Sequence, residues 1–379
     1  RNMKSYISRP LCTNKIEPFI GKDLIKVITD QRRICKSYIL LQISDIIKEK
    51  TPEANIIFID KELLAFADMK NYMDLYQYVL KKAAGHNYNY LFVDEVQEIE
   101  EFQLCLRSLL NENICDIYCT ESNAKMLSGE LATHLAGRYI EFPVHSLSYE
   151  EFLRFNQLQD SPESLRLYLM FGGMPYIHNL AMDINVIFEY LRNVYSTILL
   201  KDVVARESIR NVSFLENLVG YLVDNTGSLF SAQNISKYLK SQQVNIPAQT
   251  ILNYLKALCN SFFVYKIQRA ETQGMKIFEI GEKYYFEDLG LHNAIRHHDF
   301  RRDINKLIEN VVCIDLLRYG YEVYVGKNGD KEIDFIASQR DHKIYIQVAY
   351  MLLDEAAVQR EFGNCLLYTS PSPRDTERS

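Results

Sequence analysis

A strand, a short loop and a Lys-Ser pair at the start of a helix constrain this 379-residue chain more than any other feature. The apolar pairs Leu24-Ile25 and Val27-Ile28 predict a short buried strand, and apolar residues that recur at helical spacing from Ile39 to Ile47 predict a helix. The loop at 29–35 leads into Lys36-Ser37. This is the layout of a P-loop, in which loop amides and a helix N-terminus surround phosphates, a lysine reaches them and a serine hydroxyl binds Mg²⁺.

The loop departs from the usual pattern at two positions. Asp30 and Cys35 stand where a P-loop has glycines. Glycine lets the backbone approach a phosphate without a Cβ atom in the way, and Asp30 adds a negative charge where an anion would bind. The loop alone therefore leaves two interpretations open, a phosphate site or a plain strand–loop–helix with a solvated lysine.

A second apolar strand, residues 90–93, ends in Asp94-Glu95. In a P-loop enzyme an aspartate at this strand end helps to hold Mg²⁺, and an adjacent glutamate polarises the attacking water. By themselves, two acids after a strand also fit a solvated turn. Because Lys36-Ser37 precedes them in the expected order and separation, we predict Ser37 and Asp94 as metal ligands and Glu95 as a catalytic residue.

Two further residues are candidates for catalysis. Asn123 follows the next predicted strand, residues 115–120, and an amide there can contact the γ-phosphate or the water; the alternative is a helix N-cap. Arg138 can act as an arginine finger, within the chain or across a subunit interface. The alternative for Arg138 is an ordinary surface arginine.

Strands alternate with helices through the first part of the chain, which predicts an α/β fold with a parallel sheet and ligands at the carboxyl ends of its strands. The composition then changes several times along the sequence. We predict a P-loop ATPase core at 1–147, a helical segment at 148–225, a winged helix at 226–290, a small α/β restriction-endonuclease-like domain at 300–362, and a non-native tail at 365–379.

The winged-helix prediction rests on two short amphipathic helices, the first capped by Ser231 and the second opened by Pro247. β-like segments at 263–269 and 275–280 would form the wing. Between Ser231 and Lys276 six basic residues stand against one glutamate, a net charge of +5 in a chain of −6. Such a basic region permits nucleic-acid contact, although a winged helix that packs on protein is the alternative. The candidate contacts are Lys237, Lys240, Gln249, Asn253 and Lys256.

The C-terminal region has the order of a metal nuclease, with Glu309 on a helix, Asp334 on a strand and Gln347 on the next strand. Glutamine is a poor Mg²⁺ ligand beside a carboxylate. The lysine that normally follows two residues later is also absent. We therefore interpret Glu309, Asp334 and Gln347 as a vestigial nuclease site.

Composition limits the cellular setting. The chain is 47% hydrophobic, which suffices for ordinary cores, and no apolar run approaches the roughly 20 residues of a membrane span. The eight cysteines form no C-x-x-C pair, so we expect free thiols in the cytoplasm. Cys115 and Cys119 with His134 could be metal ligands, but we favour buried small hydrophobes.

Taken in order, these motifs resemble the prokaryotic AAA-type P-loop ATPase family that carries an accessory C-terminal domain of unknown function. The similarity lies in VITDQRRICKS, YLFVDEVQEIE, IYCTESNAKMLSGELATHLAGRYIE, LSYEEFL, YLMFGGMP, LFSAQNISKYLKS, KYYFEDLGLHNAI and EIDF…YIQVAY. It covers nearly the whole chain except the tail. The resemblance implies ATP and Mg²⁺ as ligands. The implied nucleotide-binding residues are Asp30, Gln31, Arg32, Arg33, Ile34, Cys35, Lys36, Ser37 and Tyr38.

Three glycines usual in the family are replaced, by Asp30, Cys35 and Glu121. Two new acids near a triphosphate cost roughly 1–4 kcal/mol for each close like-charge contact. We therefore expect an ATP-binding, Mg²⁺-dependent ATPase by descent, with a degenerate Walker A loop and weak affinity. The alternative is a nucleotide-independent module that binds DNA or a protein through the winged helix. A homo-oligomer is a further expected partner state.

Overall fold

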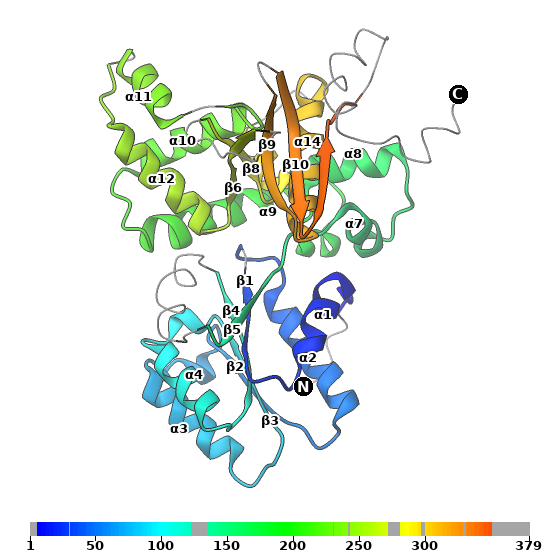
Figure 1. The fold of residues 1–379 in the computed structure, drawn as a ribbon, viewed down its shortest axis with the longest axis vertical. Coiled ribbons are helices and arrows are strands. Elements are labelled where there is room, and N and C mark those ends of the chain that lie inside the picture. Colours follow the sequence, from blue (N-terminus) through cyan, green and yellow to red (C-terminus); the bar gives the residue numbers. More distant parts are fainter. Residues whose placement is uncertain are drawn as a thin grey trace. The chain divides into compact units, whose positions relative to one another are not determined.

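The fold is described from a computed structural model that covers residues 6–29, 31–122, 135, 137–229, 231–241, 243–271, 281–296, 300–328 and 331–350. It divides into two compact units (Figure 1). The first contains the chain up to Leu158 together with Asn260–Phe262, and the second contains Gln159–Cys259 and the chain from Phe263. Within the described residues, no helix is long and apolar enough to cross a membrane.

The first unit is built on a five-stranded parallel sheet with the strand order β2-β3-β4-β1-β5. The strands are β1 (Ile25–Thr29), β2 (Asn55–Asp60), β3 (Asn89–Asp94), β4 (Asp116–Glu121) and β5 (Tyr139–Pro143). The helices are α1 (Pro10–Ile16), α2 (Lys36–Lys50), α3 (Tyr72–Ala83), α4 (Phe102–Asn111) and α7 (Tyr149–Asn156), with short 3-10 turns at Glu17–Phe19, Leu64–Phe66 and Val96–Glu98. The predicted α/β fold with a parallel sheet is confirmed.

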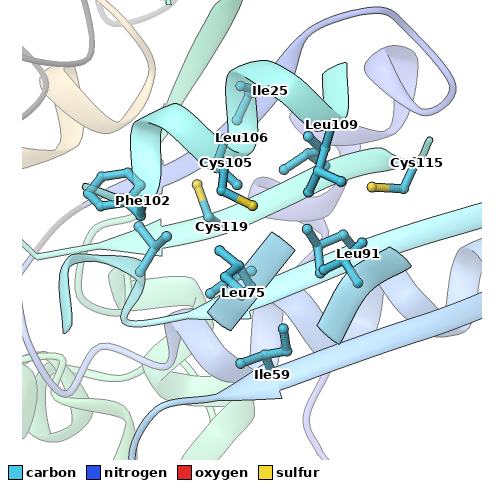
Figure 2. Packing of buried hydrophobic residues seen from close by; sticks show 14 of the residues in the cluster. Ile25, Ile59, Leu75, Leu91, Phe102, Cys105, Leu106, Leu109, Cys115 and Cys119 are labelled. Atoms are coloured by element: carbon cyan, nitrogen blue, oxygen red, sulfur yellow. The ribbon is translucent and has the colours of Figure 1, made fainter. Parts of the chain in front are cut away.

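Helices cover both faces of this sheet, with α3 and α4 on one face and α1 and α2 on the other (Figure 1). The strands of a parallel sheet covered on both sides are nearly continuous apolar runs. All five residues of β1 are buried, including Lys26, whose ammonium pairs with the Asp116 carboxylate. On the α3/α4 face, alternate strand residues pack against Leu75, Phe102 and Leu109 (Figure 2). This packing fixes the positions of the strand ends, where the candidate functional residues lie.

Three cysteines of the first unit belong to its packing. Cys105, Cys115 and Cys119 are buried in the apolar cluster between the sheet and α4 (Figure 2). Burial raises the pKa of the Cys115 thiol to about 12. Cys115 and Cys119 therefore act as small hydrophobes. His134, the third member of the alternative metal site, lies outside the described residues.

The second unit begins with helices and ends with a sheet. Its helices are α8 (Pro162–Phe171), α9 (Ile184–Thr197), which continues as a π-helix (Ile198–Ala205), α10 (Val212–Asp224), α11 (Ala232–Ser241), α12 (Ala248–Asn260), α13 (Leu289–Ile295) and α14 (Phe300–Arg318), with a 3-10 turn at Pro175–Asn179. Its strands are β6 (Val264–Ile267), β7 (Arg269–Glu271), β8 (Lys283–Phe286), β9 (Glu322–Asn328), β10 (Lys331–Gln339) and β11 (His342–Ile346).

The segment predicted as one wing strand, residues 263–269, contributes instead to two sheets. β6 pairs antiparallel with β8, whereas β7 pairs parallel with β9 in the sheet β11-β10-β9-β7. The backbone changes partner at Gln268, whose carbonyl accepts from the Val325 N–H. The predicted second wing strand, residues 275–280, lies outside the described residues. The predicted antiparallel pairing near Asp334 is present as β10 and β11.

The buried carboxylate of Asp288 joins two sequence motifs of this unit, YLMFGGMP and KYYFEDLGLHNAI. Asp288 accepts hydrogen bonds from the Gly173 N–H at 2.6 Å and from the Leu291 N–H at 3.0 Å. A Cβ atom added to Gly290 would lie 2.0 Å from the carbonyl oxygen of Phe171. Glycine is needed there because backbone meets backbone.

Asp288 makes the stability of this unit pH-dependent. Burial raises the pKa of its carboxyl from 3.8 to about 7, although the N–H donors of Gly173 and Leu291 oppose this rise. Between these pH values the folded state binds a proton that the unfolded chain has released, so the free energy of unfolding falls as the pH rises, by up to about 4 kcal/mol. Urea denaturation from pH 5 to pH 8 should show the wild type losing stability relative to Asp288→Asn. A pH-independent difference between the two proteins would contradict this assignment.

Candidate functional site

The order of the strands places several of the candidate functional residues along one edge of the first sheet. β4 lies between β1 and β3, so the carboxyl ends of β1 and β3 are about 10 Å apart. The loop to α2 leaves the end of β1, and Asp94 is the last residue of β3. α2 then brings its first turn toward that carboxylate.

A hydroxyl–carboxylate cluster bridges the gap. Thr120, near the end of β4, donates a hydrogen bond to the Asp94 carboxylate at 2.6 Å, and the hydroxyl of Ser37, in the first turn of α2, lies beside the same carboxylate. Burial raises the pKa of Asp94, the two hydroxyls oppose that rise, and the nearby Glu95 adds to it. The sequence-predicted metal ligands Ser37 and Asp94 are thus in direct contact.

Glu95 is held by four neighbouring residues. Its backbone is left-handed, with φ of 54°, and its N–H donates to the Thr120 hydroxyl at 2.7 Å. Its carboxylate accepts from Ser122 at 3.4 Å and from Gln97, and it pairs with the Arg32 guanidinium at 3.4 Å. A carboxylate fixed at this strand end could act as a general base toward a water molecule.

The loop between β1 and α2 is bent at non-glycine residues. Arg33 and Cys35 have φ values of 74° and 69°, a region that costs an L-residue roughly 1–2 kcal/mol. Cys35 occupies one of the positions where glycine is usual, and its geometry is the geometry that glycine would adopt freely. The Lys36 ammonium donates to the Gln31 carbonyl at 2.8 Å and is buried beneath the loop.

The other sequence-predicted residues of this site divide into three groups. Ile34 is buried, whereas Tyr38 is exposed. Asp30 and Asn123 lie outside the described residues. Arg138 precedes β5, so it lies at the amino edge of the sheet, where it bonds Asn111 at 2.6 Å. That edge is about 17 Å from the carboxyl edge, so Arg138 does not join the Asp94 cluster of its own chain.

Glu121, at the third replaced glycine, adds a buried negative charge to this edge. It ends β4, lies opposite Thr29 in the register with β1 and is fully buried. One of its carboxylate oxygens accepts the N–H of Ser122 at 3.0 Å. A carboxylate beside the end of β1 opposes the binding of an anion at the loop.

The donor set at this edge fits Mg²⁺. The cation prefers hard oxygen ligands and is commonly held by one or two protein oxygens together with substrate phosphates. Asp94 supplies a carboxylate and Ser37 a hydroxyl, already in contact, and the Lys36 ammonium lies at the adjoining loop. Residues of the same kinds serve as phosphate and metal ligands in P-loop proteins.

A second polar cluster lies in the second unit and contains the predicted nuclease residues. Asp334 accepts from the Gln347 amide at 2.9 Å and from the Val348 N–H at 2.8 Å. Burial raises the pKa of Asp334 to about 6, and the nearby Glu309 carboxylate contributes to this rise. The structure therefore brings Glu309, Asp334 and Gln347 together.

Lys283 places a cation in this second cluster. Its ammonium contacts Glu309 at 3.0 Å and Glu332 at 2.8 Å, and Tyr285 donates to Glu309 at 2.5 Å. Burial alone would lower the pKa of Lys283, but the two carboxylates raise it overall. Among the described residues, no group of three or more His, Cys, Asp or Glu side chains is placed to hold a metal ion.

Sequence reasoning missed Thr120, Lys283 and Glu332. Thr120 stands at the end of an apolar strand, but a hydroxyl there has no distinctive pattern. Lys283 reaches Glu309 from a strand 26 positions earlier in the sequence, so no local spacing could reveal the pair. The position of Arg138 could have been inferred, because it precedes its strand instead of following it.

Comparison with known proteins agrees with this arrangement. A family model described as an AAA domain matches residues 22–153, and one described as a domain of unknown function matches residues 162–303. An uncharacterized protein of Haemophilus influenzae is 34% identical over 356 residues, which cover 92% of this chain and 88% of that protein. The chain belongs to the family of AAA-domain proteins with a C-terminal domain of unknown function.

An archaeal relative extends the family. An uncharacterized protein of Methanocaldococcus jannaschii is 30% identical over 356 residues, covering 89% of this chain and 77% of that protein. Membership in the AAA-domain family supports a nucleotide-binding, ATPase-like function.

Solved structures show weaker likenesses. The RuvB Holliday junction branch migration motor of Thermotoga maritima is 14% identical with a TM-score of 0.34, over 71% of this chain and 89% of that one. DnaA of Aquifex aeolicus bound to AMPPCP is 12% identical with a TM-score of 0.32, over 65% and 85%. No functional argument rests on likenesses of this size.

The Lys283 cluster generates a test of the second unit. Lys283→Met leaves Glu309 and Asp334 close together without the ammonium, and breaking a largely buried ion pair costs about 3 kcal/mol. We expect a lower urea midpoint for Lys283→Met and partial recovery in Lys283→Met/Glu309→Gln. Equal midpoints for Lys283→Met and the wild type would show that the ammonium does not stabilise this cluster.

Proposed function

We propose that the protein binds ATP with Mg²⁺ at the carboxyl edge of the first sheet and hydrolyses it slowly, as an ATPase with a degenerate Walker A loop. The observation that carries the proposal is the contact of Ser37 with Asp94, supported from the intervening strand by Thr120. Two oxygen ligands from different elements meet beside a lysine-bearing loop. A solvated turn, the alternative for Asp94-Glu95, would not bury both carboxylates.

Each side chain has a proposed task. Lys36 neutralises phosphate charge, while Ser37 and Asp94 hold the cation. When bound, Mg²⁺ supplies positive charge to the β- and γ-phosphate oxygens. Glu95 accepts a proton from the attacking water, and Asn123 remains the predicted contact to that water or the γ-phosphate.

Arg32 forms an ion pair with Glu95 that a bound phosphate would disturb. The Arg32 guanidinium lies 3.4 Å from the Glu95 carboxylate and 3.7 Å from Glu62. A phosphate at the loop would compete with Glu95 for Arg32. Arg138, at the opposite edge, would have to act on a neighbouring copy of the chain, so its proposed role depends on a homo-oligomer.

A second candidate function is DNA binding by α11 and α12. All five predicted contacts, Lys237, Lys240, Gln249, Asn253 and Lys256, are exposed. The Gln249 amide donates to Asn253 at 3.0 Å along the outward face of α12. Exposed amides and lysines on one helix face fit a groove contact, and we propose this winged-helix role as independent of nucleotide. We also propose the cytoplasm as the location of the protein, because the cysteines of the described residues are free thiols.

The altered loop predicts weak ATP binding that two reversions strengthen. In Asp30→Gly/Cys35→Gly, removal of one negative charge and of the left-handed cysteine should tighten Mg-ATP binding at least about tenfold, equivalent to about 1.4 kcal/mol. Titration calorimetry on the full chain and the revertant measures this change. Lys36→Ala in the revertant is the control and should abolish binding. Absence of ATP binding by both the full chain and the revertant would rule out the proposed function.

Neutralising the basic helix face tests the second candidate. Lys237→Gln/Lys240→Gln/Lys256→Gln should weaken binding to a fluorescent DNA duplex. The slope of the logarithm of the binding constant against the logarithm of the salt concentration should fall by about one per lost phosphate contact. The matched control is Lys22→Gln/Lys48→Gln/Lys81→Gln, which removes three exposed lysines from the first unit. Equal anisotropy titrations for the two triple variants would leave α11 and α12 without a specific role in DNA binding.

A further inference from the structure

Arg9 is a fully buried arginine behind the phosphate loop, and the proposed function gives it no task. Only 1% of its surface is exposed. Its guanidinium forms a two-pronged pair with Glu151, at 2.9 Å on each prong. Burying an arginine is costly unless its donors are satisfied, so the remaining contacts show what the side chain holds in place.

Two of these contacts are backbone carbonyls from separate parts of the first unit. Arg9 donates to the His145 carbonyl, just after β5, at 2.9 Å, and to the Ile34 carbonyl, inside the phosphate loop, at 3.4 Å. Glu151 is itself fixed, because it forms a reciprocal capping box with Ser148 at the start of α7. The guanidinium therefore connects the loop to α7 and to the segment after β5.

The contact with Ile34 determines the direction of the next amide. In a trans peptide the carbonyl and the following N–H point to opposite sides, and no cis peptide occurs among the described residues. With the Ile34 oxygen turned to Arg9, the Cys35 N–H points away from Arg9. Cys35 is the N-cap of α2, where N–H groups form an anion-binding end.

Cys35 also needs outside support. Its left-handed backbone is one that a non-glycine residue adopts only when the surroundings enforce it. The Arg9–Ile34 hydrogen bond acts on the peptide immediately before this residue. The backbone of Arg9 is held in turn, since its N–H donates to the Gln42 side chain of α2 at 2.9 Å.

We propose that Arg9 is a positioning residue for nucleotide binding: it orients the Ile34–Cys35 peptide so that the Cys35 amide faces the phosphates despite the missing glycine. The proposal rests on the proposed function for its ligand. Its structural part, the fixing of the loop, holds with or without ATP.

Arg9→Lys is the informative variant. It keeps a cation beside Glu151 but loses the fork that reaches both carbonyls. The matched control is Arg154→Ala, since Arg154 also holds the N-terminal segment, through the Ser8 carbonyl at 2.7 Å, without touching the loop. Both are made in the full chain with Cys35 and in its Cys35→Gly background.

Amide hydrogen exchange on the nucleotide-free protein is the first readout. Arg9→Lys should speed exchange in peptides covering residues 31–38 at least about tenfold, and Arg154→Ala should leave it unchanged. Unchanged exchange in Arg9→Lys would overturn the proposal, whether or not ATP binds. A uniform increase across all peptides of the first unit would also overturn it, because that indicates a general loss of stability.

Inorganic pyrophosphate binding by calorimetry is the second readout. In the chain that keeps Cys35, Arg9→Lys should lower the affinity for pyrophosphate at least tenfold. In the Cys35→Gly background the loss of affinity should be less than threefold, because glycine adopts the left-handed backbone without support. Equal losses in the two backgrounds would overturn the proposed link between Arg9 and Cys35. Faster loop exchange in Arg9→Lys, together with no Mg-ATP binding by the wild type or by the Asp30→Gly/Cys35→Gly revertant, would uphold the positioning of the loop by Arg9 and reject the proposed function.

Discussion

The candidate site depends on one contact, that of the Ser37 hydroxyl on α2 with the Asp94 carboxylate at the end of β3. Ser37 follows β1 and Asp94 ends β3, and these two strands are not neighbours because β4 lies between them. Thr120 on β4 fills the gap, bonding both the Asp94 carboxylate and the Glu95 amide. Without the parallel sheet and its packed helices, these three strand ends would have no fixed separation.

The same edge carries unusual strain and charge. Arg33, Cys35 and Glu95 all have left-handed backbones, and Asp94, Glu95 and Glu121 are all buried acids. Strain of this kind persists where the surrounding structure enforces it, and it concentrates at functional sites. The Arg9–Glu151 pair and the Lys36–Gln31 contact provide that enforcement on either side of the loop. We therefore interpret the degenerate loop as a phosphate loop held in shape by its neighbours.

Much of the first unit was predictable because its signals are local. β4, Asp116–Glu121, lies within one residue of the segment predicted as a strand, residues 115–120. The meeting of Ser37 and Asp94 follows from the rule that parallel strands end at one edge. Predictions in the second unit were less complete, because one backbone turn at Gln268 redirects β7 to β9 and no sequence pattern marks it.

Residues that act through long-range contacts were beyond reach. Arg9 and Glu151 are 142 positions apart, and Lys283 and Glu309 come from separate elements. A buried charge looks like a surface charge in sequence, since only the fold shows what encloses it. Arg138 shows the converse: its residue type fits a phosphate contact, but its place before β5 puts it at the far edge from the Asp94 cluster of its own chain.

A crystal structure of the Asp30→Gly/Cys35→Gly protein with Mg²⁺ and a non-hydrolysable ATP analogue tests the central claim most directly. The account predicts the triphosphate against the amides of residues 35–38, with the cation contacted by Ser37 and Asp94 and with Arg9 still bonded to the Ile34 carbonyl. Nucleotide bound elsewhere on the chain, with Ser37 and Asp94 remote from both cation and phosphates, would contradict it.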